Sequence, residues 1–295
     1  MFSNIFLMPK LEQYEKFTVA YTTQILGTSY DLYSYTAPSV LSGEAFSGGW
    51  LSAADIGPDV IWVSPKDNLN LAAPITWTNP ETAAQYHNND PSVIEIGNVM
   101  YMYMTSLSNQ YTSLNDITNN NTVALAKSFD GGKTWDYLGP QFSGWSPSAI
   151  QLHNDIYIFF HNAQSQTEFE ILANNGTTTL SAPQLTNINA INVSVIQVGK
   201  ELILVGNDGN FGEGFGNIVA YTASVFNPTH WIPLLASGDI IAHGKYMNLT
   251  PEIISEGKGN FTLTYTEDLA HDSYGFPIIG AAQETVTMKM EFHLG

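Results

Sequence analysis

The sequence contains no cysteine and no arginine. Without cysteine the chain has no disulfides, no thiol catalysis and no thiolate metal sites. All nine basic residues are lysines, and 27 acidic residues bring the formal net charge to −18. Such a chain cannot build the basic surface that nucleic acids and anionic membranes attract. We therefore expect no nucleic-acid partner.

Charged residues and long apolar runs are also scarce. Charged residues make up 12% of the chain, about half the usual share. No segment reaches the roughly 18 apolar residues of a membrane-spanning helix, so we expect no membrane insertion. Residues 1–10 lack the charged start and full apolar core of a signal peptide. Asn, Ser, Thr and Tyr supply the polar surface, which suits an extracellular or virion-surface protein, exported after leader removal or by another route.

A five-residue pattern occurs five times along the chain. Its copies start at residues 37, 90, 146, 192 and 250, and are therefore 53, 56, 46 and 58 residues apart. They read Ala-Pro-Ser-Val-Leu, Asp-Pro-Ser-Val-Ile, Ser-Pro-Ser-Ala-Ile, Asn-Val-Ser-Val-Ile and Thr-Pro-Glu-Ile-Ile. The last four each run into a tight Gly, Asn or Asp turn and a second apolar strand, which indicates a hairpin. The period is that of one four-stranded propeller blade.

No amphipathic helix separates these apolar runs, so a parallel α/β sheet is disfavoured. The sequence predicts an all-β fold, a five-bladed β-propeller of four-stranded antiparallel blades, as one domain over residues 1–295. Strand-like alternation over 17–26 and 284–292 predicts that the N- and C-terminal strands share a blade and close the ring. The inner strands are predicted near 38–42, 91–96, 147–152, 193–198 and 251–255.

Residues 128–135 read Ser-Phe-Asp-Gly-Gly-Lys-Thr-Trp and match the Asp-box of propeller proteins, S/T-x-D-x-G-x-T-W. We expect this segment to form the turn between the third and fourth strands of the second blade. Asp130 can accept hydrogen bonds from the turn, the glycines allow positive φ, and Trp135 can pack beneath. The predicted role is structural, on the outer side of the blade.

The repeat count and the Asp-Pro-Ser-Val pattern resemble the five-bladed propeller glycosidases of the arabinanase, xylosidase and fructosidase type. The resemblance implies a central funnel with three carboxylates on inner strands: a base or nucleophile in an Asp-Pro motif, a Glu acid and a second Asp. On this resemblance Asp90 matches the base or nucleophile. Glu252 is the other carboxylate in the aligned segments and is assigned the acid role, since glycoside cleavage needs one ionised and one protonated carboxyl.

Polar and aromatic residues near the strand ends are candidates for a funnel rim. Trp145 is the best candidate for stacking on a sugar ring, with Asn and Asp bonding its hydroxyls. The predicted substrate-binding set is Trp145, His87, Asn89, Ser148, His161, Asn192 and Asp208. No tight ligand spacing indicates a metal site, so no metal and no cofactor are predicted, with structural calcium left open.

Two functions remain open on these residues. One is hydrolysis of a neutral glycan through Asp90 and Glu252. The other is a non-catalytic glycan-binding or attachment protein of a virion or cell surface, which could form an oligomeric assembly. Asn192 stands where the family has its second Asp, and Glu252 follows Pro251 instead of preceding Gly-Pro, which favours the second. A sialidase is excluded because those enzymes grip the sugar carboxylate with arginines.

Overall fold

The computed structural model describes residues 17–18, 24–28, 39–50, 59–65, 73–78, 80, 85–107, 121–209, 217–234, 239–241, 247–257, 260–268 and 283–292. Every regular element in this part of the chain is a β-strand. None of its elements is a helix that could span a bilayer.

The strands form five antiparallel sheets, called here the first to fifth sheets in chain order. The first contains β3 (Ser39–Leu41), β4 (Glu44–Trp50), β5 (Asp59–Pro65) and β6 (Ala73–Ile75). The second contains β7 (His87–Ile96), β8 (Val99–Leu107), β9 (Thr122–Ser128) and β10 (Asp136–Ser143). The third contains β11 (Trp145–Leu152), β12 (Asp155–His161), β13 (Thr167–Ala173) and β14 (Gln184–Leu185).

The fourth sheet contains β15 (Ala190–Val198), β16 (Glu201–Asp208), β17 (Ile218–Ser224) and β18 (Ile232–Pro233), with β19 (Asp239–Ile241) also paired to β17. The fifth contains β20 (Met247–Gly257), β21 (Asn260–Asp268) and β22 (Gln283–Phe292). β22 also pairs with both N-terminal strands, β1 (Phe17–Thr18) and β2 (Gln24–Thr28). Strands from the two ends of the chain therefore share one sheet.

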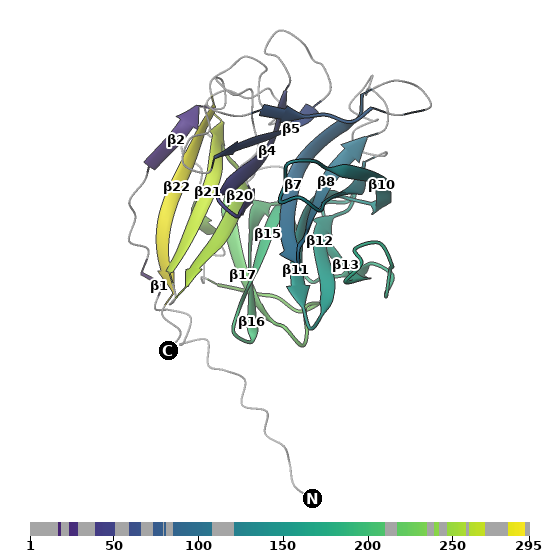
Figure 1. Ribbon diagram of the computed structural model, residues 1–295. Coiled ribbons are helices and arrows are strands. Elements are labelled where there is room, and N and C mark those ends of the chain that lie inside the picture. The colour runs from purple at the N-terminus through teal and green to yellow at the C-terminus, as the bar shows by residue number, and fades with distance from the viewer. Residues whose placement is uncertain are drawn as a thin grey trace, which may run out of the picture.

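The sheets are arranged as a propeller, with β3, β7, β11, β15 and β20 on their inner edges (Figure 1). Each inner strand described contacts the next one along the chain: β3 with β7, β7 with β11, β11 with β15 and β15 with β20. The predicted all-β propeller, closed by the N- and C-terminal strands, is confirmed. Each repeated segment contributes the inner strand of a different sheet, although Ala37 and Pro38 of the first copy lie outside the described residues.

Among the described residues the hydrophobic core forms four clusters, each between two consecutive sheets. The cluster between the second and third sheets joins Tyr103 and Leu125 to Ile158 and Phe160. The cluster between the third and fourth sheets contains Trp231, which contacts Phe159 edge-on with ring centroids 5.7 Å apart. Burial of this apolar surface between sheets is the main force that holds neighbouring sheets together.

A ring of hydrogen bonds links the inner strands near the central axis. In each case a buried backbone N–H donates to the serine of the preceding sheet: Val93 to Ser39 (3.2 Å), Ala149 to Ser92 (2.9 Å), Val195 to Ser148 (2.9 Å) and Ile253 to Ser194 (3.1 Å). These serines occupy the third position of four repeated segments. We call Ser39, Ser92, Ser148 and Ser194 the serine ring.

The segment 128–135 forms the turn between β9 and β10, where the motif predicts it. Asp130 accepts hydrogen bonds from the Ser128 hydroxyl and from the hydroxyl and amide of Thr134, at 2.7 to 2.9 Å. These bonds lower the pKa of Asp130 to about 2. The Trp135 indole donates to the Gly132 carbonyl (2.9 Å), and β10 continues on the outer side of the sheet.

Replacing Ser148 with Ala tests the serine ring. The change leaves the buried N–H of Val195 without an acceptor, so we expect the free energy of unfolding to fall by about 1–3 kcal/mol. Chemical denaturation measures the loss, and Ser143→Ala, at an exposed position on β10, is the matched control with a change near zero. Equal stability of the two variants would show that the ring is not stabilising.

Candidate active site

Four repeated segments begin with a residue in the left-handed region of backbone space. Their φ values are 48° for Asp90, 47° for Ser146, 49° for Asn192 and 46° for Thr250. At each of them the pairing with the second strand of the sheet shifts register, which is a β-bulge. In a residue other than glycine this conformation costs a free energy on the order of 1–3 kcal/mol. Asp and Asn adopt it more readily than other residues do.

The bulges lengthen the inner strands. The repeat pattern predicts that these strands start near residues 91, 147, 193 and 251, but they begin at His87, Trp145, Ala190 and Met247. A residue before proline is normally extended, and a strand is expected to start at the proline. Here the irregular residue lies in the bulge instead, and the strand also pairs with its neighbour on the N-terminal side of the bulge.

The bulge residues line a small cavity of about 30 Å³ at the start of the inner strands. We call it the entrance cavity, and it is lined by residues 90–91, 146–147, 192–193 and 250–252. A second, larger cavity of about 310 Å³ lies further along the same strands, toward their hairpins. This hairpin cavity is lined by residues 39–40, 92–94, 148–150, 195–197 and 252–255.

Asp90 is held in the entrance cavity by two hydroxyl groups. Thr105 Oγ1 (2.8 Å) and Ser146 Oγ (2.9 Å) both donate to its Oδ2. Thr105 Oγ1 also accepts the backbone N–H of Ser146 (2.7 Å), which leaves its own hydrogen directed at Asp90. Oδ1 accepts no hydrogen bond from a described residue. Dense packing around the carboxyl raises the pKa of Asp90, and the two hydroxyl donors oppose that rise.

A chain of polar contacts continues from Asp90 around the cavity. Ser146 Oγ also lies 2.8 Å from Asn192 Oδ1, so its single hydrogen serves either this amide or the carboxylate. Asn192 Nδ2 donates to Asn207 Oδ1 (3.2 Å), which also accepts the backbone N–H of Thr250 (2.9 Å). Second-strand side chains thus satisfy the polar groups that the bulges expose.

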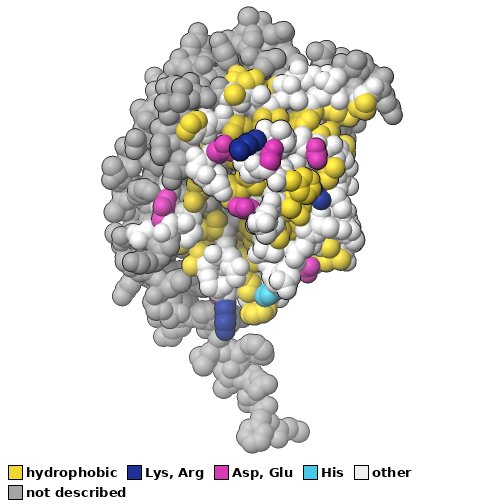
Figure 2. Space-filling view, viewed as in Figure 1, with side chains coloured by type: hydrophobic (Ala, Val, Ile, Leu, Met, Phe, Trp, Pro, Cys, Tyr) yellow, Lys and Arg dark blue, Asp and Glu magenta, His cyan; other side chains and the backbone are white. Residues whose placement is uncertain are grey.

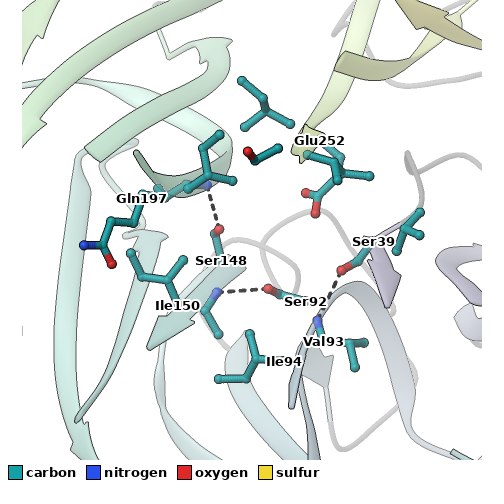
Figure 3. A pocket seen from close by; sticks show the side chains of 15 residues that line it. Ser39, Ser92, Val93, Ile94, Ser148, Ile150, Gln197 and Glu252 are labelled. Carbon is teal, nitrogen blue, oxygen red and sulfur yellow. Dashed lines mark hydrogen bonds between the residues drawn. The ribbon is translucent and has the colours of Figure 1, made fainter. Parts of the chain in front are cut away.

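Glu252 lies at the boundary of the two cavities and lines both. It occupies the serine position of the fifth repeat. Figure 3 shows its carboxyl group turned into the hairpin cavity on the side of Ser39. Burial raises the pKa of Glu252 to about 7 and outweighs the hydroxyls of Ser194 and Ser39, which lower it. Asp90 and Glu252, the two predicted catalytic residues, therefore line one common cavity.

Two predicted substrate-binding residues lie at or beside the entrance cavity. Asn192 lines it, and Trp145 directly precedes Ser146, which also lines it. The half-buried Trp145 ring stands edge-on to His161, with ring centroids 5.0 Å apart. His161 is buried, which lowers its pKa to about 3 and keeps it neutral, and its Nδ1 has no partner among the described groups.

The other four predicted substrate-binding residues have different surroundings. His87 is buried between the first two sheets, where its Nδ1 accepts the N–H of Asp59 (3.2 Å) and burial lowers its pKa to about 4. Asn89 is half-buried directly upstream of the first described bulge. Ser148 belongs to the serine ring and lines the hairpin cavity. Asp208 is half-buried at the end of β16.

Sequence reasoning missed the residues that orient Asp90. Ser146 is the first residue of its repeat, as Asp90 is of the preceding one, so the repeat alignment could have identified it. No sequence pattern marks Thr105, because only the register of β8 against β7 brings it to the site. Among the described residues, no three His, Asp or Glu side chains gather closely enough to hold a metal ion.

No protein-family model and no curated protein sequence matches the chain. Solved structures do share its fold. An α-L-arabinofuranosidase from Lactobacillus brevis superposes with a TM-score of 0.65 at 14% identity, over 87% of this chain and 90% of that one. A GH43_1 enzyme from Xanthomonas citri superposes with a TM-score of 0.62 at 11% identity, over 95% of this chain and 92% of that one.

A GH43 protein from Bacillus licheniformis gives a TM-score of 0.62 at 13% identity, and this chain spans 54% of its length. Identities this low establish a common fold and nothing finer. The chain has the β-propeller fold of these glycosidases, as the repeat pattern predicts.

Glu252→Gln tests the burial of this carboxyl group. Its pKa is about 4.5 when unfolded and about 7 when folded, so its favourable contribution is complete below pH 4.5 and is lost as pH rises to 7. Wild type should therefore lose roughly 3 kcal/mol relative to Glu252→Gln across this window.

The readout is the difference between two unfolding free energies, measured by urea denaturation at each pH. His87 and His161 have lowered pKa values and act with the opposite sign in both proteins, so the difference cancels them. Glu95→Gln, on an exposed part of β7, is the control and should follow wild type. A pH-independent difference between wild type and Glu252→Gln would contradict the assignment.

Proposed function

We propose that this protein is a glycoside hydrolase of neutral glycans, with Asp90 as base or nucleophile and Glu252 as acid. One observation carries the proposal: Asp90 and Glu252 both line the entrance cavity. Hydrolysis of a glycosidic bond needs such a pair, with one group ionised and one protonated.

The surroundings of the two groups favour this division of roles. Two hydroxyl donors favour the ionised form of Asp90 and fix its orientation, against the burial that raises its pKa, while Oδ1 is left for a ligand. A pKa of about 7 keeps Glu252 protonated in acidic media and about half protonated at pH 7, as a proton donor requires.

The volume of the entrance cavity suits one water molecule, the second substrate of hydrolysis. We place the sugar ring outside this cavity, where Trp145 offers an aromatic face next to Ser146. Xylosides and arabinofuranosides are the first substrates to test, since the structural neighbours include an arabinofuranosidase and a β-xylosidase/α-arabinofuranosidase in complex with xylotriose. We also propose, from the amino-acid composition, that the protein acts outside the cell or on a virion surface.

A second candidate function is glycan binding without cleavage. Two observations favour it: Glu252 stands at the position that a structural serine occupies in the other four repeats, and Asn192 supplies an amide in place of a third carboxylate. On this alternative Asp90 serves as a hydrogen-bond acceptor for sugar hydroxyls. The two functions differ in whether the bound glycan is cut.

Asp90→Asn separates the two functions. If the protein is a hydrolase, we expect release of nitrophenol from aryl xylosides or arabinofuranosides to fall by about 10²- to 10⁴-fold, because the amide cannot accept a proton. Binding of the uncleaved oligosaccharide, measured by calorimetry, should persist.

Asp136→Asn, at an exposed position on β10, is the matched control and should keep full activity. Cleavage that survives in Asp90→Asn would overturn the site assignment. A wild-type protein that binds oligosaccharide and cuts none of the panel would favour the second function.

A further inference from the structure

The hairpin cavity lies away from Asp90, and the Glu252 carboxyl group is turned into it. Its floor is polar, with Ser92, Ser148 and the Glu252 carboxyl group turned toward one another around the axis (Figure 3). Its wall is aliphatic, because an isoleucine stands two positions after Ser92, Ser148, Ser194 and Glu252: Ile94, Ile150, Ile196 and Ile254. All four isoleucines are only partly buried, so the wall is available to a ligand.

The polar floor is built to accept hydrogen bonds. Ser92 Oγ and Ser148 Oγ each accept one backbone N–H, which leaves each oxygen a second lone pair. Glu252 adds carboxylate oxygens and is the only ionisable residue in the described lining. An ammonium group has three N–H donors and no acceptor, and matches these three oxygen-bearing side chains.

The charge of the molecule favours the same ligand. The chain carries a formal net charge of −18, which raises the local concentration of cations and disfavours anions. On the face drawn in Figure 2, the described acidic side chains are scattered among uncharged ones, without a basic patch. A volume of about 310 Å³ exceeds the roughly 150 Å³ that encloses benzene, so a body of about five or six carbons fits.

We propose that the hairpin cavity binds a small aliphatic primary ammonium ion. The ammonium group pairs with the Glu252 carboxylate and the hydroxyls of Ser92 and Ser148, and the hydrocarbon body lies against the four isoleucines. This site is distinct from the glycan site at the other end of the inner strands, although Glu252 borders both.

Pentylammonium is the probe, and calorimetry on the whole protein at about pH 8 is the measurement. We expect binding of pentylammonium at least about tenfold tighter than binding of pentanol, which has the same body without the charge. Glu252→Gln should remove most of that difference. Equal affinity for the amine and the alcohol, or an unchanged affinity in Glu252→Gln, would overturn the proposal.

A second variant keeps the test valid if Glu252→Gln fails to fold. Ile150→Phe fills the wall and should weaken pentylammonium binding about tenfold, whereas Ile171→Phe, on β13 outside the cavity lining, should leave it unchanged. Equal binding by these two variants would place the amine elsewhere. Asp90→Asn should bind pentylammonium like wild type, so a failure of the glycosidase proposal is distinguishable from a failure of this one.

Discussion

The propeller depends on serine hydroxyls that accept buried backbone N–H groups between neighbouring inner strands. An inner strand is the edge of its sheet, so its outward N–H groups have no partner within the sheet. Near the axis they are also shielded from water, and an unpaired buried N–H is costly. Serine solves both problems with a side chain short enough for strands to approach closely. The interaction repeats at Val93, Ala149, Val195 and Ile253, each bonded to the preceding sheet.

The fifth repeat departs from this pattern. It carries Glu252 where the other four repeats carry the serine, so a titratable group lies among the inner strands. Burial at this position raises the pKa of Glu252 to about 7, against the hydroxyls of Ser194 and Ser39, which lower it. The position that links inner strands in the other repeats therefore holds a carboxyl group with a shifted pKa in the fifth.

The fold could be predicted from the sequence because each sheet begins with one copy of the repeated segment. The sequence also located the turn at 128–135 and the pairing of terminal strands on β22. It could not predict the bulges, since Asp90 precedes a proline and is expected to be extended. The turn at Trp231, whose indole donates to Pro228 O as Trp135 does to Gly132 O, also went unnoticed because its sequence departs from the motif. Thr105 reached Asp90 only through strand register.

The bulges decide which residues can act together. Simple alternation would direct the first and third residues of each repeat to one common face. With the first residue at positive φ, the two positions are separated along the axis instead: Asp90 lines only the entrance cavity and Ser92 only the hairpin cavity. Glu252 is the residue that lines both cavities among those described. The fifth repeat therefore borders a cavity of about 30 Å³ and one of about 310 Å³ with a single carboxyl-bearing residue.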